Sequence, residues 1–239
     1  MDFSILAGSW NGFQPSPEDI QQAERQAANE ILGKNKTVEQ LFELVENARS
    51  RLAALIAPIL AEIPMDCRPG CAWCCHLYVV MTTIPELLVI AEHLRSTLAE
   101  AELADVRQRT STTLERRRSK HKFQPAVPFI PCPLLVDDRC SVYEVRPLVC
   151  QAWYSADIRL CQQSEGGLTA NQDIMRLFSG ISVGLSAALA DHGLECREVE
   201  LIAALEIALN APDVTQRWLA GESLFAAAEA PPVIKKLAR

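Results

Sequence analysis

Two groups of cysteines are the residues of this sequence whose type and spacing could do chemistry. The chain has nine cysteines among 239 residues, and eight of them fall in the segments 67–75 and 132–161. Thiolates bind zinc, iron and iron–sulfur clusters. A lone cysteine is often a small buried hydrophobe, but that does not explain eight in two groups. The predicted metal ligands are therefore Cys67, Cys71, Cys74, Cys75, Cys132, Cys140, Cys150 and Cys161.

The first group has its thiols at helical spacing. A helix that begins near Gly70 would carry three thiols on one face, at positions i, i+3 and i+4: Cys71, Cys74 and Cys75. A turn before that helix would bring Cys67 to the same face. Because adjacent side chains point in different directions, one metal ion cannot easily bind both Cys74 and Cys75. The pair indicates two metal positions, or one ligand beside a second, reactive thiol.

The second group contains its own signals for local structure. Ser141 and Glu144 match a capping box, which predicts a short helix directly after Cys140 that Pro147 ends. Cys140 would then precede a helix N-terminus, where the helix dipole favours a thiolate. Nearby arginines could donate hydrogen bonds to sulfur, and Arg146 is the predicted cofactor-binding residue. The ninth cysteine, Cys196, stands alone and is expected in the core.

Composition and charge restrict the function. The formal charge is −7, from 23 basic and 30 acidic residues, which excludes a general nucleic-acid binder. No basic residue precedes an apolar run at the N-terminus, and the apolar stretch from Leu177 to Ala190 is too short to span a membrane. We expect a cytoplasmic protein with a metal ion as its partner, no nucleic acid and no membrane. In a reducing compartment, clustered cysteines bind metal or act in redox chemistry.

The elements that would position the cysteines are mostly helical. Apolar residues make up 49% of the chain and aromatic residues only 6%. Cap signals at Ser16, Thr37 and Thr83 open three of the expected helices. Helices are predicted over 16–33, 37–63, 83–94, a polar segment to about 122, 169–191, 197–209 and 212–219.

Few strands interrupt this pattern. A short strand is expected over 77–81, and Asp137-Asp138 is expected to form a turn. The predicted fold is therefore a mostly α single domain over 1–239. Its cysteine-rich metal core occupies 64–161 and lies between helical flanks at 16–63 and 166–230.

At these cysteines the sequence resembles the YkgJ-type cysteine-cluster family of zinc- or iron-chelating domains. The family pattern is CxxCxxCC, followed downstream by Cys-Pro-x-Leu and by Cys-x-x-Tyr-x-x-Arg-Pro-x-x-Cys. The matching residues are Cys71, Cys74, Cys75, Cys132, Pro133, Leu135, Cys140, Tyr143, Arg146, Pro147 and Cys150. The resemblance covers about 64–161 and departs at Cys67, which is separated from Cys71 by three residues rather than two. It implies bound zinc, iron or an iron–sulfur cluster and no settled reaction.

Three functions remain open at this point. The first is a metal-binding protein with one or two thiolate sites. The second is an iron–sulfur-dependent enzyme for redox or group transfer, because Cys67, Cys71 and Cys74 have the spacing of the radical S-adenosylmethionine motif. The third is a thiol-based metal-trafficking protein that uses Cys74-Cys75. No phosphate loop, nucleophile elbow or zinc-protease motif assigns a catalytic residue.

Overall fold

A computed structural model describes residues 15–33, 36–68, 70–77, 79–121, 130–163 and 170–228. This part of the chain is mostly α and has two small antiparallel sheets, so the predicted fold class is confirmed. The helices are α2 (Pro17–Leu32), α3 (Val38–Glu62), α4 (Trp73–Leu77), α5 (Ile84–Thr97), α6 (Glu100–His121), α7 (Leu148–Ala152), α8 (Ile158–Gln163), α9 (Gln172–Asp191), α10 (Leu201–Asn210) and α11 (Val214–Leu219). The strands are β1 (Met81–Thr83), β2 (Leu135–Val136), β3 (Arg139–Cys140) and β4 (Glu198–Glu200), and two 3₁₀ turns are η1 (Tyr143–Val145) and η2 (Ala226–Ala228).

Local cap chemistry sets the starts of the long helices, as predicted. The Ser16 side chain accepts a hydrogen bond from the backbone N–H of Asp19 and completes a capping box at the start of α2. At the start of α3 the Thr37 side chain accepts a hydrogen bond from the N–H of Gln40, without a reciprocal bond from the Gln40 side chain, which donates to the carbonyl of Ile31. Thr83 and Glu86 form a capping box at the start of α5. These short-range bonds explain why the helix starts follow from the sequence.

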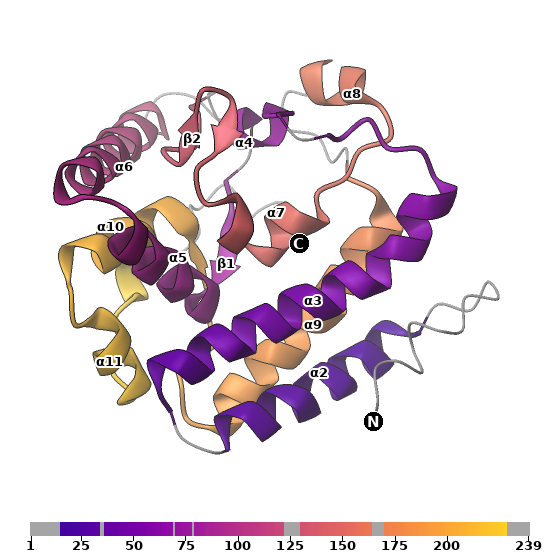
Figure 1. The fold of residues 1–239 in the computed structure, drawn as a ribbon, viewed down its shortest axis with the longest axis horizontal. Helices are drawn as coiled ribbons and strands as arrows, with labels where there is room; N and C mark the ends of the chain where they lie inside the picture. Colours follow the sequence, from indigo (N-terminus) through magenta and orange to yellow (C-terminus); the bar gives the residue numbers. More distant parts are fainter. Residues whose placement is uncertain are drawn as a thin grey trace.

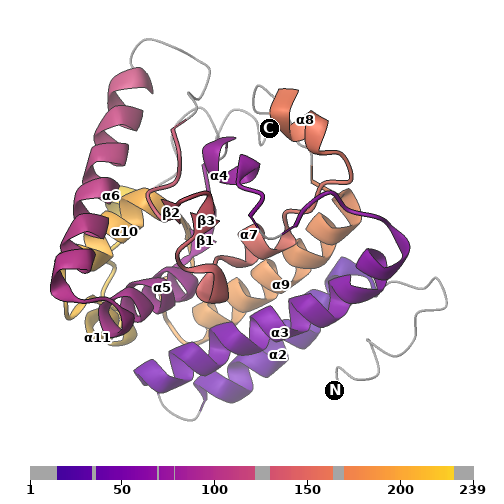
Figure 2. The ribbon, with the colours of Figure 1, turned by 45° about the horizontal axis from the view of Figure 1, so that its top comes forward.

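Helices α2, α3 and α9 form one side of the molecule (Figures 1 and 2). Their buried faces enclose an apolar cluster that also takes in two side chains of α7, Leu148 and Ala152. Helix α9 approaches α2 closely because it has glycines at the crossing. A Cβ atom at Gly184 would lie 2.5 Å from the carbonyl oxygen of Gln21 and 2.7 Å from Cβ of Glu24.

Replacing Gly184 with alanine should therefore destabilise the packing of α9 on α2. The new methyl group meets backbone that cannot rotate away, so we expect a loss of about 1–3 kcal/mol in the free energy of unfolding. Urea unfolding of the variant measures this loss. Val183→Ala is the matched control, since Val183 precedes Gly184 on α9 and is exposed. Equal stability of the two variants would contradict the close approach.

Helix α9 is, within the described ranges, long and apolar enough to cross a membrane by length and composition alone. The prediction that this region is too short to span a membrane rested on its uncharged part alone, 177–190. Half of the apolar window is buried inside the protein. Its contacts with α2, α3 and α7 are those of a helix in a protein core.

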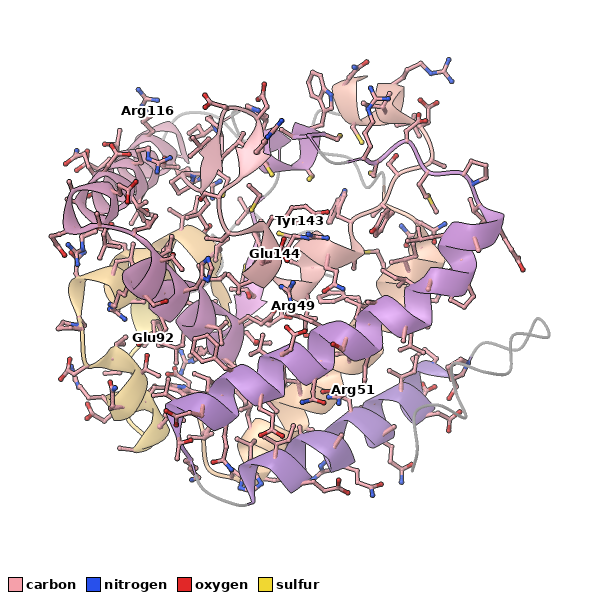
Figure 3. All side chains as sticks on the ribbon, viewed as in Figure 1. Arg49, Arg51, Glu92, Arg116, Tyr143 and Glu144 are labelled. Carbon is pink, nitrogen blue, oxygen red and sulfur yellow. The ribbon has the colours of Figure 1, made fainter. Side chains whose placement is uncertain are left out.

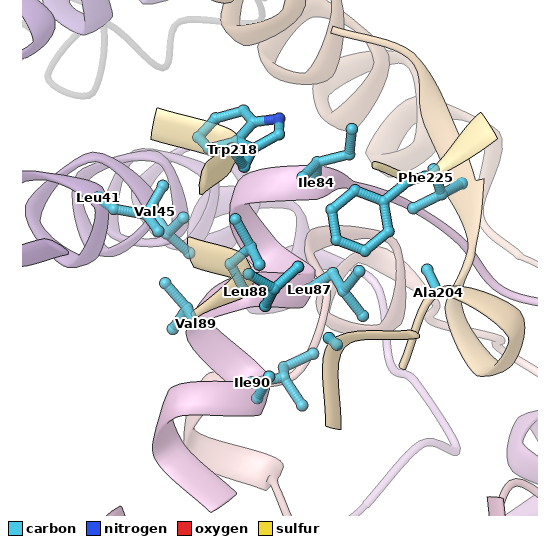
Figure 4. Close-up of a cluster of buried hydrophobic side chains, with 14 of the residues drawn as sticks. Leu41, Val45, Ile84, Leu87, Leu88, Val89, Ile90, Ala204, Trp218 and Phe225 are labelled. Carbon is cyan, nitrogen blue, oxygen red and sulfur yellow. The ribbon is translucent and has the colours of Figure 1, made fainter. Parts of the chain in front are cut away.

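A second apolar cluster is centred on α5, α10 and α11 and extends to α2, α3 and α9 (Figure 4). Trp218 and Phe225 are fully buried there. Strands β1 and β4 pair at the edge of this cluster, with Met81 opposite Glu200. Strand β4 occupies residues that were predicted to open the helix over 197–209, and the helix instead begins at Leu201. Pairing with β1, more than a hundred residues earlier in the chain, favours the extended form there.

Candidate metal centre

Seven of the eight predicted ligands line one cavity of about 580 Å³: Cys67, Cys71, Cys74, Cys75, Cys132, Cys140 and Cys150. Figure 3 shows sulfur atoms, in yellow, gathered between α4 and α7. Cys161 is outside this lining and is buried on α8, which contacts α4. Cys196 is exposed, so the expectation that it lies in the core is wrong. The structure thus brings together cysteines from both sequence groups.

The first cysteine group differs from its prediction in one respect. Helix α4 begins at Trp73 rather than near Gly70, so Cys71 precedes the helix and does not share a helical face with Cys74 and Cys75. Gly70 has φ +88°, a left-handed conformation that glycine adopts readily. After this turn the N–H of Cys71 donates to the carbonyl of Arg68 at 2.9 Å. A turn, and not a helix, therefore brings Cys71 to the cavity.

Cys67 is held against the loop that follows α7. The backbone N–H of Ser155 donates to Cys67 Sγ at 3.2 Å, and the Cys67 thiol faces the carbonyl oxygen of Trp153 at 3.8 Å. The neighbouring Asp66 N–H donates to the carbonyl of Ser155 at 3.0 Å. Burial raises the pKa of the Cys67 thiol. These bonds place Cys67 at the cavity despite its irregular spacing in the sequence.

The two cysteine groups are joined by a direct backbone bond. The N–H of Cys132 donates to the carbonyl oxygen of Cys75 at 2.8 Å. Strands β2 and β3 then form a hairpin whose turn residues, Asp137 and Asp138, have φ of 50° and 57°. This confirms the predicted turn, because positive φ at both positions is typical of a two-residue hairpin loop. The hairpin delivers Cys140 to the cavity.

The segment between Cys140 and Cys150 also differs from its predicted structure. The expected short helix is the 3₁₀ turn η1, which starts after Val142 and has no side-chain cap. The capping box predicted from Ser141 and Glu144 is therefore wrong. Pro147 ends the turn as predicted and begins α7, which carries Cys150. Helix α7 was not predicted, since five residues contain too little periodicity to identify.

A buried carboxylate that sequence reasoning did not assign to the site positions Cys150. Glu86 Oε2 accepts hydrogen bonds from the N–H of Thr83 at 3.0 Å and from its hydroxyl at 2.6 Å. Glu86 Oε1 accepts a bond of 2.5 Å from the N–H of Leu148, at the start of α7. The capping box at Thr83 was visible in the sequence, but the bond to Leu148 spans 62 residues and had no local signal. Glu86 therefore fixes α7, and with it Cys150, against α5.

Arg146 lies in the cavity wall, as its predicted cofactor-binding role requires. Its guanidinium carbon is 3.6 Å from the ring centroid of Tyr143, and its Nη1 donates to the Tyr143 carbonyl at 3.2 Å. Arg49 Nη1 in turn donates to the carbonyl of Arg146 at 2.7 Å. The positive charge of Arg146 contributes to lowering the pKa of Cys74. Burial raises the pKa of Cys140, and the charge of Arg146 offsets part of that increase.

The thiols of the cavity differ in how readily they ionise. A hydrogen bond from the Cys75 thiol is the main cause that lowers the pKa of Cys74 to about 7, and the same bond raises the pKa of Cys75. Burial raises the pKa of Cys132 to about 11 and raises that of Cys150 well above its ordinary value. At neutral pH Cys74 of the metal-free protein is therefore close to half ionised, whereas Cys132 and Cys150 hold their protons.

Cys74 should be the first thiol of the group to react in the metal-free, reduced protein. We expect iodoacetamide to label it before the other cavity thiols, with a rate that is half-maximal near pH 7, because only the thiolate is nucleophilic. Peptide mass spectrometry after short labelling at several pH values checks this. Arg146→Gln should move the midpoint upward, since it removes a positive neighbour. Preferential labelling of Cys75 would contradict the assignment.

The donor set fits zinc or iron. Thiolate sulfur is the ligand of structural zinc and of iron–sulfur clusters, and the cavity offers more than the four thiolates that either takes. In the described ranges no three cysteine, histidine, aspartate or glutamate side chains are already gathered at bonding distance from one point. Metal binding would thus draw the thiols toward one another, with Cys150 fixed on α7 and the five-residue helix α4 as the short element that can shift.

The fold and this cavity define a class: a helical protein with a thiol-lined, metal-chelating centre. Residues 66–171 match the model of the family described as "CxxCxxCC: Putative zinc- or iron-chelating domain", which confirms the resemblance. The matched segment contains all eight predicted ligands and leaves out Cys196. No curated protein and no solved structure matches the chain.

Proposed function

We propose that this protein binds zinc or iron through thiolates of both cysteine groups. One observation carries the proposal: seven cysteines, from segments separated by a long helical insertion, line a single cavity. Helices α5 and α6 lie between those segments in the chain. Convergence of so many thiols from two distant segments has no ordinary packing explanation.

The number of thiols favours more than one metal atom. A closed zinc site takes four ligands, and a cubane iron–sulfur cluster takes four cysteines. The vicinal Cys74 and Cys75 cannot easily serve one ion together. A [4Fe–4S]-type cluster, or two metal positions, uses the available thiols better than one zinc ion does. We therefore propose a polynuclear centre, with an iron–sulfur cluster as its first candidate.

The charges of the cavity wall support such a centre. Four thiolates on a divalent ion leave a net charge of about −2. Arg68, Arg139 and Arg146 line the same cavity and offset that charge. The buried pair of Arg117 and Glu200, joined at 2.9 Å, is internally neutral. The net positive charge of the cavity wall therefore comes from the three arginines that line it with the thiols.

The different pKa values of the thiols determine the order in which they would bind the metal. Cys74, with a pKa near 7, is the first thiolate and so the first ligand. The buried thiols of Cys132 and Cys150 then release their protons, because a bound cation favours the charged form. The bound metal itself would supply structural cross-linking or electron transfer. This order requires reduced thiols, so we also propose that the protein acts in a reducing compartment such as the cytoplasm.

Thiol accessibility tests the proposal. Reduced, metal-free protein should show all nine cysteines reactive to a disulfide reagent under denaturing conditions. After reconstitution with Fe²⁺ and sulfide, or with Zn²⁺, native protein should keep the exposed Cys196 reactive and protect the cavity cysteines. A Cys196→Ala variant should then show almost no fast-reacting thiol. Unprotected cavity thiols after both reconstitutions would contradict metal binding there.

A further inference from the structure

The thiol-lined cavity is larger than its metal requires. Its volume is about 580 Å³. A metal ion with sulfur ligands at about 2.3 Å fills a sphere of only about 50 Å³, and even several metal atoms would leave much of the space free. Cavities that bind small organic molecules measure roughly 300–1,000 Å³. The site therefore has room for an organic ligand beside the thiols.

One wall of this cavity is apolar and built by tertiary pairing. The N–H of Leu201 donates to the carbonyl of Val80 at 2.9 Å, which extends the pairing of β1 and β4 to the rim of the cavity. Val79, Val80, Leu201 and Ile202 line the cavity from these two segments. Aliphatic side chains cannot coordinate a metal, so these four residues do not contribute to a thiolate site. An apolar surface beside a few polar groups is typical of a small-molecule site.

Arg146 is one of the polar residues that line this cavity. Stacking on Tyr143 uses the flat face of the guanidinium, and Nη1 donates a hydrogen bond to the Tyr143 carbonyl. Within the part of the chain that the structure describes, no carboxylate pairs with Arg146, whereas the half-buried Arg51 pairs with Glu24 and the buried Arg117 pairs with Glu200. A guanidinium edge donates two parallel hydrogen bonds to a carboxylate. Arg146 thus has donors left for a ligand.

The surroundings of Arg146 reinforce this preference for an anion. Arg68 and Arg139 also line the cavity, and in the described ranges neither has a carboxylate partner. The acidic residue in the lining, Asp138, lies 3.7 Å from Nε2 of His76. The backbone of Arg146 is held on both sides, by the bond from Arg49 and by the ring of Pro147. The guanidinium is therefore presented in a fixed position next to the thiols.

We propose that the cavity binds a small molecule with a carboxylate and an apolar body, in addition to its metal. The carboxylate pairs with the guanidinium of Arg146, and the apolar body lies against the wall formed by Val80 and Ile202. This inference rests on the proposed function, because the ligand shares its cavity with the metal centre. The substrates or effectors of the metal site would then be carboxylic acids with a hydrocarbon portion.

Two probes that differ only in charge test this inference. 4-Phenylbutanoate and its neutral amide are titrated into the metal-loaded full chain by calorimetry, with metal content measured on each sample. We expect the acid to bind about tenfold more tightly than the amide, since a charge-assisted hydrogen bond is worth roughly that factor. Arg146→Gln should remove the difference. Arg176→Gln, on the exposed pair of Arg176 with Asp173, is the matched control and should keep it.

The outcomes separate this inference from the proposed function. Equal binding of acid and amide by metal-loaded wild-type protein, or no binding of either, overturns the inference and leaves the metal centre intact. Wild-type protein that takes up no metal contradicts the proposed function instead. If Arg146→Gln fails to fold, the comparison of acid and amide on the wild-type protein still decides. Retained acid preference in a folded, metal-loaded Arg146→Gln variant also overturns it.

Discussion

Replacing Cys150 with alanine should remove most of the bound metal and destabilise the protein in the same step. Cys150 lies on α7, which is packed on α3 and α9 and tied to Glu86, so no neighbouring thiol can move into its place. Metal binding is coupled to folding, and the loss of a ligand is a loss of folding free energy. For a chain of this size a loss of about 4 kcal/mol lowers the melting temperature by about 10 °C.

Metal analysis and thermal unfolding of the Cys150→Ala variant measure the two effects together. Cys196→Ala is the matched control, because Cys196 is exposed and lies outside both the cavity and the matched segment. It should keep full metal content and melt as the wild type does. A Cys150→Ala variant with full metal content and an unchanged melting temperature would remove Cys150 from the ligand set.

Replacing Glu86 with alanine should have a comparable effect without touching a thiol. The variant leaves the buried N–H groups of Thr83 and Leu148 without their acceptor, and each unsatisfied donor costs about 1–3 kcal/mol. We therefore expect a loss of about 2–6 kcal/mol in the free energy of unfolding of the metal-free protein. Because α7 is then no longer fixed at its start, the metal content should also fall.

The design of the Glu86 experiment separates hydrogen bonding from packing. Glu86→Gln keeps the shape and one acceptor oxygen, so its urea unfolding free energy should lie between those of Glu86→Ala and the wild type. Glu115→Ala, on the exposed surface of α6, is the control and should change stability by less than about 0.5 kcal/mol. Wild-type stability and metal content in Glu86→Ala would show that Glu86 does not position α7.

The elements that followed from the sequence are those whose signals are local. Ser16 and Thr37 mark helix starts because their side chains accept a bond from the backbone N–H three residues on, and Thr83 marks one because it bonds to the Glu86 carboxylate three residues on. The turn at Asp137-Asp138 is equally local. The grouping of cysteines in the sequence identified seven predicted ligands that line one cavity, since the pattern of thiols reflects binding chemistry rather than secondary structure. The division into a core and two flanks stays a prediction.

The features that did not follow from the sequence depend on a distant partner or on the backbone conformation of a single residue. Strand β4 exists because β1 pairs with it, and nothing near Glu198 indicates that partner. Helix α4 starts at Trp73 because a left-handed Gly70 turns the chain first, which removes the single helical face expected for three cysteines. Ser141 and Glu144 satisfy a capping-box pattern but do not form it, as Val142 takes the cap position. At β4 a distant partner overrides the local helix signal, and at Gly70 and Val142 the local backbone conformation departs from the pattern of side chains.

The metal and acid-labile sulfide content of the protein, purified without air and without a histidine tag, tests the central claim most directly. We predict zinc or iron near stoichiometric amounts, and for the iron–sulfur form sulfide in proportion to iron with absorption toward the blue end of the visible spectrum. Zinc without colour or sulfide would retain the metal-binding function and exclude the cluster. Folded protein with no metal and with every cavity thiol free would contradict the account.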